Sequence, residues 1–420
     1  MQSSTLTLVF AAFVLASVAT KLWLSSRQVR HVARHRDQLP PAFSEAVGLY
    51  NHQRAADYTV DKLRFEMISL AIGTAVLLGW TLLGGLDALN ASLRESVIPR
   101  FGNLGYQLAL LGAFGLISSL VDLPLAAWNT FRIEQRHGFN RMSFGMWLGD
   151  QLKEGLLGVA LGLPIAALIL WLMGAAGPQW WLWAWGAWVG FSLLLMIVFP
   201  IFIAPLFNKF SPLEDQTLKD KVESLMSRCG FAAKGLFVMD GSRRSAHANA
   251  YFTGLGSSKR VVFYDTLLNR LNHGEIEAVL AHELGHFKHK HVFKRMIGSF
   301  VISLLGFALL GWLSHQAFFY QGLGVTPNMT VPNNALALLL FMLAVPVAMF
   351  FVSPIFAHFS RRDEFQADAY ACLHAKASDL RQALIKLYKD NSSTLTPDPV
   401  YVRFYYSHPP AAERMAAMGL

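Results

Sequence analysis

Seven apolar stretches, each long enough to cross a bilayer as a helix, dominate this chain of 420 residues. About 20 apolar residues in a helix span the hydrocarbon core of a membrane. In chain order the stretches lie near residues 4–24, 65–88, 105–128, 154–174, 180–207, 293–320 and 334–358. Hydrophobic residues make up 54% of the chain and charged residues 15%, which excludes an ordinary soluble protein. We therefore predict a mainly α-helical, multi-pass integral membrane protein that has the lipid bilayer as a partner.

The charge of the loops predicts how the spans are oriented. The net charge of +9 would suit a nucleic-acid binder, but the basic residues cluster beside the apolar spans, so we expect no nucleic-acid partner. Lys and Arg are frequent in the loops after spans one, three and five, and absent from those after spans four and six. Arg94 and Arg100, after span two, are the exceptions. The positive-inside rule therefore predicts an outside N-terminus and a cytosolic C-terminus.

The sequence HELGH, formed around His282, Glu283 and His286, carries the chemistry. Residues four apart share one face of a helix, so both imidazoles can bind one Zn²⁺ ion and leave room for a third protein ligand and water. Glu283 lies about 100° around the helix and is placed to act as general base on that water. Asn272 is a plausible N-cap, with Glu275 three residues later.

The segment 208–292 is the one sizeable non-membrane insertion before the tail. It predicts a helix at 213–229, short strands at 236–239, 247–253 and 260–264, and a HELGH helix that runs on into span six. We expect residues 1–207 to form a membrane domain of five spans. Residues 208–420 would form a small α+β, gluzincin-type zinc peptidase domain that includes spans six and seven and the cytosolic tail.

Glu364 is the best candidate for the third zinc ligand. The loop between spans six and seven is short, so residues just after span seven should meet the HELGH helix just before span six. Asp368 lies four residues after Glu364 and can accept the spare N–H of a ligating histidine. His289 and His291 are alternatives, but we expect them to be solvated or interfacial.

Several motifs together resemble the type I CAAX prenyl protease family, the membrane-embedded a-factor-converting enzymes. They are HELGH with SRRDEFQAD (360–368), EQRHGFNRMSFGMWLGD (134–150), PLFNKFSPLED (205–215), AHANAYFTG (246–254) and YYSHPPAAERM (405–415). The resemblance covers nearly the whole chain and implies seven long helices that enclose a water-filled chamber. It also implies one catalytic zinc.

The resemblance implies a role for each matched site residue. It assigns His282, His286 and Glu364 as zinc ligands, Glu283 as catalytic base, Asp368 as support, Asn249, Ala250 and Tyr251 as a substrate-binding edge strand, and His408 as a catalytic residue with Arg414 close by at the substrate. A positive donor such as His408 could stabilise the oxyanion.

The implied activity is hydrolysis of peptide bonds in prenylated CAAX-type or other membrane-associated proteins, with a lipid or apolar segment as part of the substrate. A heat-shock-type protease for damaged membrane proteins is an alternative. A transporter or scaffold with an inactive site is another, since Asp122 and Glu154 lie within spans. The short loop between spans six and seven fits a bacterial inner-membrane protein, with its catalytic domain on the cytosolic side. We expect a monomer.

Overall fold

The computed structural model describes residues 2–44, 46–231, 235–253, 260–329 and 333–419. Within these ranges, seven helical segments are long and apolar enough to cross a membrane, as predicted. They are α1 (Ser3–Arg34), α2 (Leu49–Trp80), α3 (Gly85–Trp128), α4 (Phe144–Ala175), α5 (Trp180–Val198), α9 (His291–Leu313) and α11 (Asn334–Met349), which continues through a short turn into α12 (Ser353–His374). The fold is mainly α-helical, as the apolar pattern indicates.

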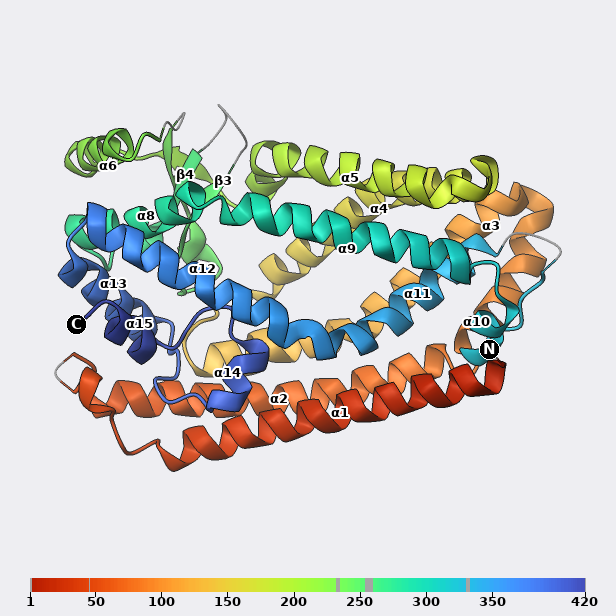
Figure 1. Cartoon of the computed structure of the whole chain (residues 1–420), viewed down its shortest axis with the longest axis horizontal. Helices are drawn as coiled ribbons and strands as arrows, with labels where there is room; N and C mark the ends of the chain where they lie inside the picture. The colour runs from red at the N-terminus through yellow and green to blue at the C-terminus, as the bar shows by residue number, and fades with distance from the viewer. Residues whose placement is uncertain (1, 45, 232–234, 254–259, 330–332, 420) are drawn as a thin grey trace.

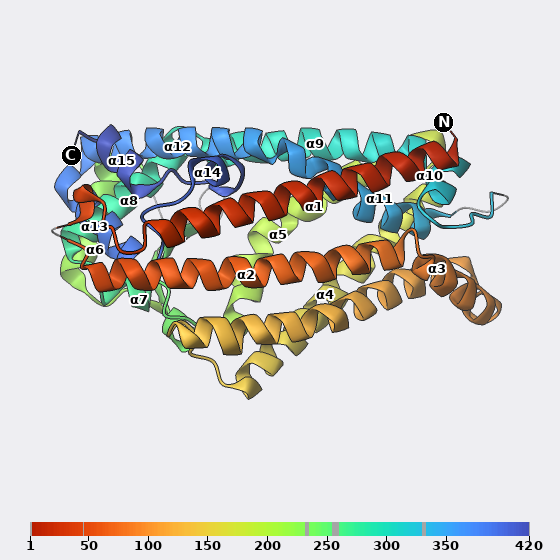
Figure 2. The ribbon, with the colours of Figure 1, turned by 90° about the horizontal axis from the view of Figure 1, so that it is seen from below.

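The membrane helices form a closed ring. Each packs against the next in the order α1, α2, α3, α4, α5, α9 and α11, and α11 packs against α1. Figure 1 shows α1 and α2 on one side of the bundle and α5 and α9 on the other, and Figure 2 shows α1 and α2 side by side. The N-terminus lies at the end of the bundle opposite the C-terminus and the tail helices.

The structure corrects the limits of several spans. The second was predicted to reach residue 88, but α2 ends at Trp80 and α3 begins at Gly85, after a turn in which Gly84 has φ 77°. The sixth was predicted to reach residue 320, but α9 ends at Leu313 and a short separate helix, α10 (Ala317–Gly322), follows. The first break lies in the mostly apolar sequence TLLG (81–84), which hydropathy does not separate from a span; the second lies at the polar residues 314–316, which apolar residues follow directly.

A small sheet of four strands lies at one end of the bundle. Its strands are β1 (Phe210–Pro212), β2 (Leu236–Met239), β3 (Ala250–Thr253) and β4 (Arg260–Tyr264), in the order β1-β2-β4-β3. β3 pairs antiparallel with β4 and is an edge strand. The predicted strand at 247–253 was too long at its start, and β1 was missed because three residues carry no recognisable alternation.

Helices that precede and follow spans six and seven in the sequence pack with the sheet and form one core. α6 (Gln216–Arg228) and α8 (His273–Lys288) pack with α12 and α13 (Ala377–Asp390) around buried residues such as Leu225, Phe263 and Leu280. The tail continues with α14 (Pro399–Tyr405) and α15 (Ala411–Ala417). The HELGH helix does not run on into span six as predicted, because Lys290 adopts a left-handed conformation (φ 56°) between α8 and α9.

Candidate metal centre

Helix α8, which carries HELGH, begins at a capping box. The Asn272 side chain accepts a hydrogen bond from the Glu275 N–H at 2.9 Å, and the Glu275 carboxylate accepts one from the Asn272 N–H at 2.8 Å. The two bonds satisfy N–H groups that the start of a helix otherwise leaves unpaired. The predicted N-cap is therefore confirmed. Lys386 of α13 forms an ion pair with Glu275 at 2.7 Å, which ties the start of α8 to the tail.

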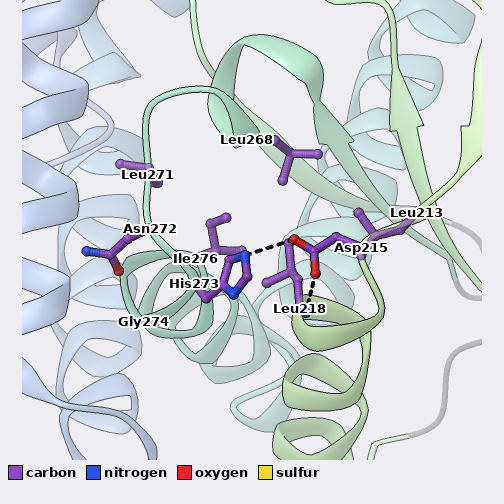
Figure 3. Close-up of a pocket in the computed structure, with 9 residues that line it drawn as sticks. All are labelled: Leu213, Asp215, Leu218, Leu268, Leu271, Asn272, His273, Gly274 and Ile276. Carbon is purple, nitrogen blue, oxygen red and sulfur yellow. Dashed lines mark hydrogen bonds and ion pairs between the residues drawn. The ribbon is translucent and has the colours of Figure 1, made fainter.

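An ion pair also ties the start of α8 to α6 (Figure 3). His273 Nε2 lies 2.9 Å from Asp215 Oδ2, while Asp215 caps α6 by accepting a hydrogen bond from the Leu218 N–H. Both residues line a pocket of about 600 Å³ whose other walls are mostly apolar. None of the predicted site residues lines this pocket. We conclude that the ion pair anchors α8 from behind and takes no part in the chemistry.

Gly285, the glycine of HELGH, lets α12 approach α8 closely. A Cβ built on Gly285 would lie 2.9 Å from the Ala367 Cα and 3.1 Å from the Ala367 carbonyl oxygen. Because these are backbone atoms, they cannot move aside as the end of a flexible side chain can. The close crossing brings Glu364, about one turn before Ala367, to the two HELGH histidines. The hairpin formed by spans six and seven thus places Glu364 beside the HELGH histidines, as the sequence predicts.

Four ligand-type atoms, from three residues, converge between α8 and α12. His282 Nε2 lies 3.3 Å from His286 Nε2 and 3.4 Å from Glu364 Oε2, and His286 Nε2 lies 3.3 Å from Glu364 Oε1. Donors bound tetrahedrally to zinc at about 2.0–2.1 Å stand about 3.3–3.4 Å apart, which matches this spacing. Glu364 Oε2 is buried without a hydrogen-bond partner in the described part of the chain. A cation would compensate that orphaned oxygen, so the residues fit a metal ion.

Asp368 and Arg414 support His282 from behind. His282 Nδ1 lies 2.8 Å from Asp368 Oδ1, and Arg414 donates two hydrogen bonds to the Asp368 carboxylate, at 2.6 and 2.8 Å. Asp368 can accept the Nδ1–H of His282, which leaves the Nε2 lone pair free for a metal. The resemblance implies a place for Arg414 at the substrate; in the structure its side chain is buried against Asp368 and also lines the pocket that contains His282 and Glu283.

His291 supports the second histidine in a similar way. His286 Nδ1 lies 2.9 Å from His291 Nδ1, and His291 Nε2 lies 3.0 Å from Gln366 Oε1. If His286 Nε2 faces a metal, its Nδ1 carries the proton and donates to His291, whose own Nε2–H then donates to Gln366. His291 is 1% exposed, so the expectation of a solvated or interfacial residue was wrong for it. Because the helix breaks at Lys290, helical spacing does not predict the contact between His286 and His291.

Glu283 lines a pocket of about 960 Å³ together with His282, Glu364 and His408. Burial raises the pKa of the Glu283 carboxyl above its ordinary value. A carboxylate with a raised pKa is a stronger base near neutral pH. The position of Glu283 beside the two histidines and its burial both suit the role of proton acceptor.

His408 reaches the site from the tail. Its Nε2 lies 3.5 Å from Glu364 Oε1, and His408 itself lies in the turn between α14 and α15. The His408 side chain is 61% exposed, so it can contact a molecule in the pocket. The Tyr388 hydroxyl donates a hydrogen bond to the Pro409 carbonyl at 3.2 Å, which helps to hold the turn that presents His408.

The predicted edge-strand residues lie in two different places. Asn249 and Ala250 line the pocket that contains the three ligand-type residues. Tyr251 instead lines a second pocket, of about 500 Å³, with Glu154 and Tyr264. The structure thus brings Asn249 and Ala250 to the candidate centre but does not bring the Tyr251 side chain there.

The larger pocket also extends to the membrane helices. Its walls include Gln28 of α1 and Tyr58, Lys62 and Glu66 of α2. The tail adds the tyrosines Tyr401, Tyr405 and Tyr406. One continuous pocket therefore connects the candidate metal centre with the ring of membrane helices.

Comparison with known proteins decides the family. A sequence profile described as CAAX prenyl protease N-terminal, five membrane helices, matches residues 28–209, and the profile of peptidase family M48 matches residues 212–419. A protein named CAAX prenyl protease 1 homolog from Arabidopsis thaliana is 34% identical over 97% of this chain and 96% of its own length. The chain belongs to the CAAX prenyl protease 1 family. As a member of this family, it is a multi-pass membrane metallopeptidase.

Further relatives agree with this family. CAAX prenyl protease 1 of Saccharomyces cerevisiae is 35% identical over 98% of this chain and 94% of its own length. The crystal structure of Ste24p from S. mikatae is 32% identical, and the match covers 100% of both chains with a TM-score of 0.92. The resemblance seen in the motifs and the predicted seven-helix fold with a small peptidase domain are therefore confirmed.

Proposed function

We propose that the chain is a zinc endopeptidase whose ligands are His282, His286 and Glu364. The single observation that carries this proposal is the spacing of 3.3 to 3.4 Å between donor atoms of these three residues, with one buried carboxylate oxygen that has no hydrogen bond among the described residues. Two imidazoles and one carboxylate are a ligand set that catalytic zinc sites use, and they leave the fourth position of the metal open for water. We assign residues 1–207 to the membrane domain and 208–420 to the peptidase domain.

The residues around the ligands suggest a division of labour. Zinc bound there would supply the Lewis acidity that lowers the pKa of water and polarises the peptide carbonyl. Glu283 takes a proton from the attacking water and passes it to the leaving amine. His408 donates a hydrogen bond to the carbonyl oxygen as negative charge develops on it. Asp368 holds the tautomer of His282, and Arg414 holds Asp368 in place.

The substrate lies along β3. An extended peptide can add to a free sheet edge through main-chain hydrogen bonds, and Asn249 and Ala250 lie where such an edge enters the pocket. Tyr251 contributes through its backbone, because its side chain lines the neighbouring pocket.

The preferred substrate carries a lipid or strongly apolar segment next to the bond that is cut. The pocket connects the centre with α1 and α2, so the apolar part can lie among the membrane helices while the peptide lies on β3. A prenylated C-terminal CAAX peptide satisfies this description, and relatives named CAAX prenyl protease 1 favour it. Basic loops favour a centre on the cytosolic side. We further expect a monomer in a bacterial plasma membrane.

The test offers purified enzyme three substrates: a farnesylated CAAX peptide, its unprenylated twin and an unfolded membrane protein. Glu283→Gln, which should retain the metal, is the control for contaminating proteases. We expect the farnesylated peptide to be cut faster than its twin. Cleavage of the unfolded protein alone would assign the enzyme to protein quality control. A protein without metal and without hydrolysis of any of the three would refute the peptidase proposal.

A further inference from the structure

His408 lies on a short turn between two helices of the tail. The turn joins α14, which ends at Tyr405, to α15, which begins at Ala411. Among the described residues, no backbone–backbone hydrogen bond involves Ser407 or His408. The Ser407 hydroxyl lies 2.9 Å from His408 Nδ1, but this contact joins two neighbours in the chain. The position of His408 therefore depends on what holds the two ends of the turn.

Two side chains from other helices hold these ends. Arg361 of α12 donates from Nη1 to the Tyr406 carbonyl at 2.8 Å, directly before the turn. Tyr388 of α13 donates from its hydroxyl to the Pro409 carbonyl at 3.2 Å, directly after His408. The turn is thus tied on each side to the helices that cover the candidate centre.

Arg361 also binds the end of α14 itself. The same Nη1 donates to the Val402 carbonyl at 3.0 Å, which also accepts the Tyr406 N–H at 3.1 Å. The last carbonyl groups of a helix lack intrahelical partners and form the negative end of its dipole. A guanidinium group there supplies both donors and a positive charge. One side chain therefore fixes the last turn of α14 and the first residue of the segment that carries His408.

The start of α14 is fixed independently, to α1. Asp398 accepts hydrogen bonds from two N–H groups in the first turn of α14, each at 3.0 Å. Its carboxylate pairs with Arg27 of α1 at 2.9 Å, and its N–H donates to Gln28 Oε1 at 2.6 Å. Because these contacts hold the helix without Arg361, the loss of Arg361 should loosen the turn and leave α14 in place.

Arg361 connects the turn with the helix that carries a candidate ligand. It lies three residues before Glu364 on α12, about one helical turn away. His408 Nε2 returns to within 3.5 Å of Glu364 Oε1. Arg361 is half-buried, whereas the adjacent Arg362 is exposed. The two neighbouring arginines therefore offer a matched pair for an experiment.

We propose that Arg361 is a positioning residue that holds His408 where it can donate to the substrate carbonyl oxygen. The inference rests on the proposed function, in which His408 stabilises the negative charge on that oxygen. A displacement of about 1 Å in a catalytic group can lower the rate by about 10²-fold. Arg361 would thus act on kcat through His408, without touching the substrate.

The experiment is a double-mutant cycle measured on a farnesylated CAAX peptide, with zinc analysis of each variant. Arg361→Ala should lower kcat about 10- to 100-fold, with zinc per protein and KM nearly unchanged. In a His408→Ala background the same substitution should lower kcat less than about twofold, because no donor remains to be positioned. Arg361→Lys, which keeps the charge and one donor group, should recover part of kcat.

Arg362→Ala is the matched control and should leave kcat unchanged, because this exposed arginine is the next residue on the same helix. Tyr388→Phe removes the other anchor of the turn and nearly preserves the shape of the side chain. Its loss of kcat should also disappear in the His408→Ala background. If Arg361→Ala does not fold, Arg361→Lys and Tyr388→Phe carry the same comparison.

The outcomes separate this inference from the proposed function. Equal losses of kcat with and without His408 would overturn the inference and leave the peptidase function intact. A loss of zinc that matches the loss of kcat in Arg361→Ala would also overturn it, because Arg361 would then act on the ligands. A normal kcat in His408→Ala would refute the role of His408 in the proposed function, and the inference with it. No hydrolysis by the wild type would count against the proposed function itself.

Discussion

Gly285 of α8 lies directly against the backbone of Ala367 in α12, and a Cβ added there would stand 2.9 Å from the Ala367 Cα. This contact sets the distance between the helix that carries His282 and His286 and the helix that carries Glu364. HExxH alone does not demand glycine at this position. The glycine of HELGH therefore serves the close packing of α8 against α12.

Gly285→Ala should push α8 and α12 apart and weaken metal binding. Overpacking of this kind costs about 1–3 kcal/mol of folding free energy. We expect a lower melting temperature and less zinc per protein. Gly298→Ala in α9 is the control, because a Cβ there meets nothing within 4 Å. Equal zinc content in the two variants would show that the crossing distance does not set the ligand geometry.

Glu364→Ala and Glu283→Gln should both lower turnover but differ in their effect on metal content. Glu364→Ala removes a proposed ligand, so zinc per protein should fall sharply. Glu283→Gln keeps the ligands and removes the base, so zinc should remain while kcat falls by about 10²–10⁴-fold. Metal analysis of the purified variants and peptide hydrolysis check both expectations. Full zinc and full activity in Glu364→Ala would exclude Glu364 as a ligand.

His291→Ala should reduce zinc affinity by about 10- to 100-fold, because the Nδ1–H of His286 loses its acceptor. His291→Asn, which offers an amide oxygen near the same place, should recover part of the affinity. Competition with a chelator measures affinity, and the visible spectrum of the Co²⁺-substituted protein reports ligand geometry. His315→Ala, beyond the far end of α9, serves as control. If His291→Ala changes neither the Co²⁺ spectrum nor the zinc affinity, His291 does not support the metal centre.

The orientation in the membrane follows from the loop charges. Reporter fusions near Gly177 and Pro327 should report the outside, and fusions near Gly241 and Asn391 should report the cytosol. Gly241 lies in the peptidase domain, so its side decides where substrates are cut. An outside signal at Gly241 would reverse the predicted topology.

Local signals in the sequence were sufficient for much of the fold and the centre. The strands 236–239 and 260–264 match β2 and β4, because both are short β-branched or aromatic runs between turns. Glu364 could be assigned because a short hairpin between two spans leaves few alternatives for what meets HELGH.

Contacts that depend on tertiary structure could not be predicted in this way. The His286–His291 contact follows from a left-handed residue at Lys290, and that conformation has no strong sequence signal outside glycine and asparagine. The engagement of Arg414 with Asp368 joins segments that only the folded tail brings together. Motif resemblance located Arg414 near the centre, but packing determined what it binds.

The ring of membrane helices is closed by the contact between α1, the first span, and α11, one of the last. During synthesis α1 enters the membrane long before its final neighbour exists, so the closing contact must form late. Glu364 lies in α12, directly after α11, so the candidate centre also lacks a ligand until nearly the whole chain has been made. The last ligand of the candidate centre and the last contact of the helix ring are therefore contributed by neighbouring segments near the end of the chain.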